Sequence, residues 1–340
     1  MSYLPNNYRT YKFKSSFTAS STKFRYFNDC ERKYFLHTYG SWDSGAEALG
    51  ISYDLQLEVR RLKKLDTLDS IAGTATHAVI AEIANGRRRN SSEILHLFDT
   101  LESRILRKYD DMLKSAYKVT NNSINGMIPS SDEKILSELY LCSDSREKAI
   151  EYLKTKNIKV KDKISEISKN LLSSPIFKDI TQPNSQIKLI EKEGFPKIVL
   201  FDSDIYANID LAYYLPQSNY YIVVDWKTGE PDPKVELKQL ILYAIYISEK
   251  FLMRDLRFTE NTLYINEYLS VGRRYTHLID VEAIEEYKNY LKRNIELLKS
   301  RLKDIDNNLP YNILEYSKSE DDRICKTCEM RKICEQWGNL

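Results

Sequence analysis

The stretch Tyr221-Ile222-Val223-Val224-Asp225-Trp226-Lys227-Thr228-Gly229 decides the fold that this sequence predicts. Its first four residues are apolar or aromatic, which is typical of a buried β-strand, and the Thr-Gly pair predicts a turn at the end. Residues two apart on a strand point to the same face, so Asp225 and Lys227 share one side of a sheet. Burying opposite charges is costly unless they pair or bind a ligand. We therefore expect a divalent-metal phosphodiesterase site whose other ligands come from elsewhere in the chain.

The composition is that of a globular protein with little net charge. The 340 residues are 42% hydrophobic and 29% charged, with a formal net charge of +2, so nucleic-acid binding would depend on local basic patches. No apolar leader opens residues 1–20, and the longest apolar run, Leu240 to Ile247, is too short to span a membrane. We expect a cytoplasmic protein without a membrane span. Five cysteines in that compartment favour metal binding or catalysis over disulfides.

Hydrophobic periodicity predicts an α/β (α+β) fold with a mixed central sheet flanked by helices. The expected parts are an N-terminal segment over 1–90, a helical insertion over 91–183, a core over 184–310 and a cysteine-containing tail over 311–340. Within the insertion we expect four helices, near 91–118, 132–141, 144–156 and 160–173, with a clear polar loop at 119–126. In the core, four successive strands are predicted at Ile187–Glu193, Ile198–Ile205, Tyr206–Tyr214 and Asn219–Trp226.

The other candidate site residues lie on both sides of the opening strand. Asp210 precedes it by one turn of a meander, which can bring the two carboxylates together, and Asp202 and Asp204 are alternatives nearby. Such oxygen ligands suit Mg²⁺ or Mn²⁺. Gln239 and Tyr243 lie four apart on a predicted helix and share a face. Taken singly, an Asp-x-Lys pair is more often a surface salt bridge, so the order of the whole set carries the prediction.

That order resembles the RecB-like branch of the PD-(D/E)XK nuclease superfamily. The matching motifs are Gly73-Thr74-Ala75-Thr76-His77, Ile209-Asp210, Asp225-Trp226-Lys227-Thr228-Gly229 and Gln239-Leu240-Ile241-Leu242-Tyr243. The resemblance implies a restriction-endonuclease-like core. It also implies that His77, Asp210 and Asp225 bind Mg²⁺ or Mn²⁺ together with the Trp226 backbone carbonyl. Lys227 would be the catalytic lysine, supported by Gln239 and Tyr243. Ala207 stands where the family often has a glycine, three residues before Asp210.

The cysteines form a second constellation. Cys325, Cys328 and Cys334 are a compact set of three thiols that needs a fourth ligand, for which Cys30 and Cys142 are the candidates, and four such thiolates hold zinc or an iron–sulfur cluster. One cysteine before the core and three after it resemble the [4Fe–4S] staple of AddB-type, CRISPR-associated and exonuclease V-like nucleases. By that resemblance Cys30 is the fourth ligand and the cluster is structural.

The predicted function is a metal-dependent deoxyribonuclease, by resemblance an exonuclease acting on single-stranded DNA or DNA ends. The basic residues expected to contact phosphate are Arg87, Arg88, Arg89, Arg273 and Arg274. Two alternatives stay open: a nuclease subunit that is active only beside a helicase or in a CRISPR, defence or repair complex, and a non-catalytic nucleic-acid-binding scaffold. An RNA substrate also stays open.

Overall fold

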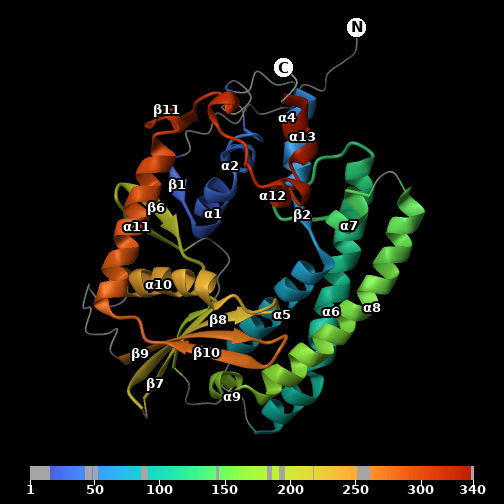
Figure 1. Ribbon diagram of the computed structural model, residues 1–340. Coiled ribbons are helices and arrows are strands. Elements are labelled where there is room, and N and C mark those ends of the chain that lie inside the picture. The colour runs from blue at the N-terminus through green and yellow to red at the C-terminus, as the bar shows by residue number, and fades with distance from the viewer. Residues whose placement is uncertain are drawn as a thin grey trace. The chain divides into compact units, whose positions relative to one another are not determined.

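A computed structural model describes residues 16–42, 48, 53–85, 91–142, 145–181, 186–190, 196–216, 218–250 and 261–337 (Figure 1). The chain divides into two compact units. The larger unit comprises residues 64–198 and 206–291, and the smaller unit comprises residues 1–63, 199–205 and 292–340. Each unit combines segments that are distant in the sequence.

A five-stranded mixed sheet forms the centre of the larger unit, in the order β10-β9-β8-β7-β4. Its strands are β4 (Gln186–Ile190), β7 (Leu211–Leu215), β8 (Tyr220–Lys227), β9 (Thr262–Tyr268) and β10 (Arg273–His277). Only the β8–β9 pair is parallel, and parallel neighbours need a long crossover. The helix α10 (Pro233–Lys250) provides that crossover. The predicted α/β class with a mixed sheet flanked by helices is confirmed.

The two faces of β8 differ in character because alternate residues point in opposite directions. Ile222, Val224 and Trp226 belong to an apolar core that includes α5 (Leu68–Ala84). The opposite face carries Asp225 and Lys227, which contact side chains of α10. The strand therefore has one wholly apolar face and one face that ends in charged groups.

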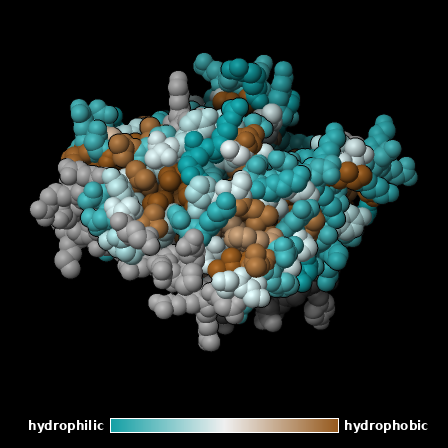
Figure 2. All heavy atoms as spheres, turned by 90° about the horizontal axis from the view of Figure 1, so that it is seen from below, coloured by the Kyte–Doolittle hydropathy of each residue, from teal (hydrophilic) through white to brown (hydrophobic). Residues whose placement is uncertain are grey.

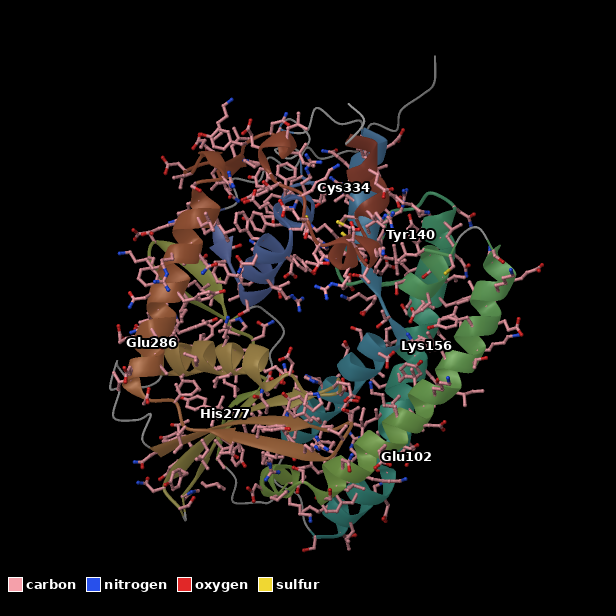
Figure 3. All side chains as sticks on the ribbon, viewed as in Figure 1. Glu102, Tyr140, Lys156, His277, Glu286 and Cys334 are labelled. Atoms are coloured by element: carbon pink, nitrogen blue, oxygen red, sulfur yellow. The ribbon has the colours of Figure 1, made fainter. Side chains whose placement is uncertain are left out.

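A long helical block packs on the apolar side of this sheet. It contains α6 (Ser91–Ile124), α7 (Ser137–Tyr140), α8 (Arg146–Ser173) and α9 (Pro175–Thr181), with a short parallel pair of β2 (Leu65–Asp66) and β3 (Ile135–Leu136). The pair α6 and α8, which carry the labelled Glu102 and Lys156, runs side by side (Figure 3). Leu68 of α5 and residues of the block that include Leu113, Leu136, Ile150 and Leu153 line an open pocket of about 430 Å³.

Three predictions for this block are wrong. The helix predicted near 132–141 is much shorter, because Ile135–Leu136 forms the strand β3 and α7 covers Ser137–Tyr140. The segment 119–126 is not a loop, because α6 continues to Ile124. Val119, Thr120 and Ser123 continue the buried stripe of the helix, and the Thr120 hydroxyl binds the Ala116 carbonyl at 2.6 Å. The helices predicted near 144–156 and 160–173 are one helix, α8. Buried residues lie on both sides of the predicted break, at Leu153, Val160 and Ile164.

A separate three-stranded sheet has the order β1-β6-β5, and its residues 18–19 and 199–205 belong to the smaller unit. Its strands are β1 (Thr18–Ala19), β5 (Lys197–Leu200) and β6 (Ser203–Tyr206), so the strand predicted over Ile198–Ile205 is two strands. The chain turns between them at Phe201 and Asp202, both in the left-handed region with φ of 53° and 52°. These strands pair with each other and with β1, whereas the prediction placed them in one meander with β7 and β8.

Helices and short strands from both ends of the chain complete the smaller unit. They are α1 (Ser21–Asp29), α2 (Glu31–Thr38), α4 (Tyr53–Leu62), β11 (Leu302–Asp304), β12 (Leu309–Pro310), a 3₁₀ turn at Ile313–Glu315, α12 (Asp322–Lys326) and α13 (Arg331–Trp337), together with the end of α11 (Val281–Lys299).

Close contacts join these N-terminal and C-terminal segments. The Arg32 guanidinium donates to the Tyr316 carbonyl at 3.0 Å, and the rings of Phe35 and Tyr316 lie 4.8 Å apart. Arg301 pairs with Glu31 at 2.7 Å, and both side chains are partly buried. The described N-terminal and C-terminal segments are therefore packed against each other.

The surface carries both hydrophobic and hydrophilic side chains. On the face shown in Figure 2, hydrophobic side chains form separate groups set among hydrophilic ones. Single exposed apolar residues such as Leu278 and Ile158 are common on water-exposed surfaces. Among the described residues, no helix combines the length and the apolar character that a membrane crossing requires.

Candidate active site

Four side chains form a closed ring of hydrogen bonds on the charged face of β8. The Lys227 ammonium donates to Asp225 Oδ2 at 2.6 Å and to Gln239 Oε1 at 3.1 Å. The Gln239 amide nitrogen donates to the Tyr243 hydroxyl, which in turn donates to Asp225 Oδ1 at 3.3 Å. Each contact matches a donor with an acceptor, and the orientation of the Gln239 amide follows from its two partners. The ring joins the end of β8 to one face of α10.

Strand register brings a second carboxylate beside the ring. Leu211 of β7 pairs with Val224 of β8 in antiparallel fashion, so Asp210, just before β7, lies next to Asp225. Asp210 Oδ2 accepts a hydrogen bond from the Trp226 backbone nitrogen at 2.7 Å. Its other oxygen lies 3.6 Å from His77 Nδ1, which comes from α5. The structure thus brings together all the residues predicted to bind the metal.

Burial and charge determine how these groups titrate. Burial, followed by repulsion from the Asp210 carboxylate, raises the pKa of Asp225 to about 6 against the opposing attraction of Lys227. Burial by itself lowers the pKa of Lys227, but attraction to Asp225 outweighs it, and the net pKa is raised. Lys227 therefore stays an ammonium at neutral pH, while Asp225 carries a charge that its surroundings disfavour.

Two polar residues at this site were missed by the sequence reasoning. Asn266 is fully buried on β9, opposite Asp225 in the parallel register, and its amide donates to Asp225 Oδ2 at 3.0 Å. Glu236 lies on α10 one turn before Gln239. An asparagine inside the apolar strand Thr262–Tyr268 was the available signal for Asn266, whereas Glu236 in a mixed helix gave none.

The donor set suits a hard divalent cation. Two carboxylates and a histidine lie in one partly buried network, and a cation would relieve the repulsion between Asp225 and Asp210. In the described part of the chain, however, no three His, Cys, Asp or Glu side chains are arranged to hold an ion directly. Lys227 and Asn266 both contact Asp225 Oδ2, an oxygen that a cation could otherwise bind. The residues fit the ion by chemistry, and Lys227 competes with it for one ligand.

The sequence pattern of the PD-(D/E)XK nuclease superfamily matches residues 18–335. The chain belongs to this superfamily. Its members are generally nucleases, hydrolases of phosphodiester bonds in nucleic acids, and generally use Mg²⁺ or Mn²⁺. The mixed sheet flanked by helices agrees with the restriction-endonuclease-like fold of the superfamily. A search of curated proteins finds no match for this chain.

The nuclease fold explains the glycine at the start of its histidine motif. Gly73 lies on a buried part of α5 against the end of β8, and a Cβ atom there would meet Thr228 Oγ1 at 2.8 Å. That separation is shorter than packed side chains adopt, so glycine permits the helix to approach the strand. The close approach sets the position of His77, one turn further along α5, beside Asp210.

The four cysteines predicted to bind a cluster lie in the smaller unit. Burial raises the pKa of the Cys325 thiol, and the thiols of Cys30 and Cys334 raise it further. Burial raises the pKa of Cys328 to about 11, with a smaller contribution from Cys30. All four are free thiols, and yellow sulfur atoms gather beside the labelled Cys334 in Figure 3. The fifth, Cys142, is exposed and belongs to the larger unit.

The predicted DNA-binding arginines have different settings. Arg87, Arg88 and Arg89 lie outside the described residues. Arg273 is exposed at the start of the edge strand β10. Arg274 pairs with the buried Glu267 at 2.8 Å and contacts Ser174. The Glu267 carboxylate therefore balances much of its charge within the fold.

The alternative aspartates belong to other structural elements than the strand ends that carry Asp210 and Asp225. Asp202 lies in the turn between β5 and β6, and Asp204 pairs with Thr18 in the three-stranded sheet. Both belong to the smaller unit, whereas Asp210 belongs to the larger one. The contacts of Asp210 with His77 and Trp226 therefore favour it as the partner of Asp225.

Proposed function

We propose that this protein is a metal-dependent deoxyribonuclease of the RecB-like branch that degrades single-stranded DNA or DNA ends as an exonuclease. The observation that carries the proposal is the closed ring of Asp225, Lys227, Gln239 and Tyr243, next to Asp210 and His77. A buried ring of this kind is costly to form, since it requires desolvating two opposite charges at the end of a strand. A catalytic use explains why the charges lie there.

Each residue has a chemical part in the proposed reaction. Asp225, Asp210, His77 and the Trp226 carbonyl would hold Mg²⁺ or Mn²⁺, which when bound supplies a Lewis acid for the scissile phosphate. The Lys227 ammonium orients the attacking water and offsets negative charge that develops on the phosphate oxygens. Gln239 and Tyr243 fix the position of Lys227, because rotation of either would break the ring.

We further propose that Cys30, Cys325, Cys328 and Cys334 hold a structural [4Fe–4S] cluster. The mutual effect of these thiols on their pKa values supports the proposal, because thiols that repel one another's negative charge would gain from a shared cation. One ligand comes from the junction of α1 and α2 and three come from the C-terminal segment, so the cluster would fasten the two ends of the smaller unit.

The nuclease assay uses the whole chain purified under anaerobic conditions. End-labelled linear and circular single-stranded DNA are incubated with Mn²⁺ or Mg²⁺, alongside the same RNA sequence. We expect the linear DNA to be degraded from an end and the circle to resist. Asp225→Ala and Lys227→Ala should abolish cleavage, whereas Lys288→Ala, which removes a lysine on α11 remote in sequence from the motifs, should not.

The outcomes separate the alternatives. Cleavage that survives in both Asp225→Ala and Lys227→Ala would refute the site. An inactive wild-type chain that still binds Mn²⁺ would indicate a subunit requiring a partner, and one that binds DNA but no Mn²⁺ would indicate a scaffold. Iron, sulfide and zinc contents with the visible absorbance test the cluster: zinc without iron would contradict it, and Cys328→Ser should yield colourless, poorly soluble protein.

A further inference from the structure

Glu236 is a half-buried carboxylate beside the site, and the proposed reaction leaves it without a part. It lies on α10 at spacings of three and seven residues from Gln239 and Tyr243, so all three lie on one stripe of the helix. Its Oε2 atom is buried and has no hydrogen-bond partner among the described residues. A buried acceptor without a donor is costly, and such groups often have a use that the resting arrangement does not show.

Lys227 competes with a divalent cation for Asp225, and Glu236 could accept the lysine in place of Asp225. Its ammonium occupies Asp225 Oδ2 at 2.6 Å, the same carboxylate that a divalent cation needs. Two positive groups on one carboxylate repel each other, so a cation that binds Oδ2 would displace Lys227 from that oxygen. Lys227 is largely buried, and leaving its ammonium with only the neutral Gln239 would cost much of what the cation gains.

Glu236 and Lys227 are within electrostatic reach of each other. Attraction to Lys227 lowers the pKa of Glu236, although burial and the Asp225 carboxylate outweigh it and raise that pKa to about 7. In return, Glu236 is one of the carboxylates that raise the pKa of Lys227. Gln239, which already accepts from Lys227, lies one helical turn beyond Glu236 on the same face of α10.

We propose that Glu236 is the second acceptor of Lys227: when a divalent cation binds Asp225, the Lys227 ammonium keeps its bond to Gln239 and moves from Asp225 Oδ2 to Glu236 Oε2. This inference rests on the proposed metal site. One charge-assisted hydrogen bond is exchanged for another, so the ammonium never loses a carboxylate partner. Glu236 is then a positioning residue, which sets where Lys227 lies in the metal-bound enzyme.

The test measures Mn²⁺ affinity by calorimetry without DNA at pH 8, where a carboxyl with a pKa of about 7 is ionised. Glu236→Gln should weaken Mn²⁺ binding at least tenfold, the size expected for one charge-assisted hydrogen bond. Lys227→Ala removes the competitor, so Mn²⁺ should bind at least as tightly as in the wild type. In that Lys227→Ala background, Glu236→Gln should have no further effect. Glu249→Gln, the same substitution on the same helix, is the matched control.

Each of the other possible results contradicts either the inference about Glu236 or the proposed metal site. Unchanged Mn²⁺ affinity in Glu236→Gln overturns the inference alone. A loss of equal size in the Lys227→Ala background also overturns it, because Glu236 would then act on the ion directly or on the fold. A wild-type chain that binds no Mn²⁺ overturns the proposed metal site and the inference with it. Urea denaturation midpoints of all variants distinguish these results from misfolding.

Discussion

Replacing Gly73 by alanine probes the contact between α5 and β8. The added Cβ would lie 2.8 Å from Thr228 Oγ1, and the next nearest atom, Thr228 Cβ, is 3.9 Å away. Overpacking of this kind costs about 1–3 kcal/mol, whereas alanine in place of glycine inside a helix gains about 1 kcal/mol. The net expectation is a loss of about 0–2 kcal/mol in the free energy of unfolding.

The companion substitution Thr228→Ala separates these two contributions. It removes the only close atom, so Gly73→Ala in that background should stabilise the protein by about 1 kcal/mol through helix propensity. The double-mutant cycle, measured by urea denaturation, should therefore give a coupling of about 1–3 kcal/mol between the two positions. Gly229→Ala is the control, because nothing lies within 4 Å of its added Cβ. A coupling below about 0.5 kcal/mol would show that the helix and strand do not meet as closely as described.

Three further predictions follow from the charges. The fold raises the pKa of Asp225 from 3.8 to about 6, so the Asp225 carboxylate destabilises the fold as pH increases through that interval. In urea denaturation, Asp225→Asn should therefore be more stable than the wild type by up to about 3 kcal/mol at pH 8, and it should show no gain at pH 4. Asn266→Ala removes a donor to Asp225, so Mn²⁺ affinity measured by calorimetry should fall more at pH 6 than at pH 8; equal losses would contradict this reasoning. Hydrogen bonds from His37 and Lys33 outweigh burial and lower the pKa of Glu329 to about 2. Glu329→Gln should therefore lower the free energy of unfolding by up to about 3 kcal/mol at pH 7, and urea denaturation should show that the difference from the wild type becomes smaller below pH 4.5.

Local chemistry made the opening strand predictable. Four apolar residues followed by alternating polar and aromatic ones define β8 with little help from the rest of the chain, and the shared face of Asp225 and Lys227 follows from strand geometry. Their ion pair at 2.6 Å confirms that part of the prediction. The i, i+4 spacing of Gln239 and Tyr243 likewise predicted one helix face, which the ring confirms.

Tertiary contacts decided what the sequence could not show. The polar segment 119–126 looked like a loop, but burial of Val119 and Thr120 against the helical block extends α6 through most of it. Asn266 reaches Asp225 only because β9 pairs with β8 in parallel, with α10 and ten undescribed residues between them. No spacing rule connects positions joined by such a crossover, so a pairing partner of this kind must be found from the register.

The two faces of β8 explain why the site lies at the end of this strand. His77 arrives on α5, which packs on the apolar face, and it reaches the charged groups only because Gly73 allows that helix to pass the end of the strand. Gln239 arrives on α10, which packs on the opposite face. A site assembled from both faces must lie at the strand end, since the sheet itself separates the two layers elsewhere. Moving the Asp-x-Lys pair one residue along β8 would turn both charges into the apolar core, so the register of this strand, more than any single ligand, determines whether the nuclease has an active site.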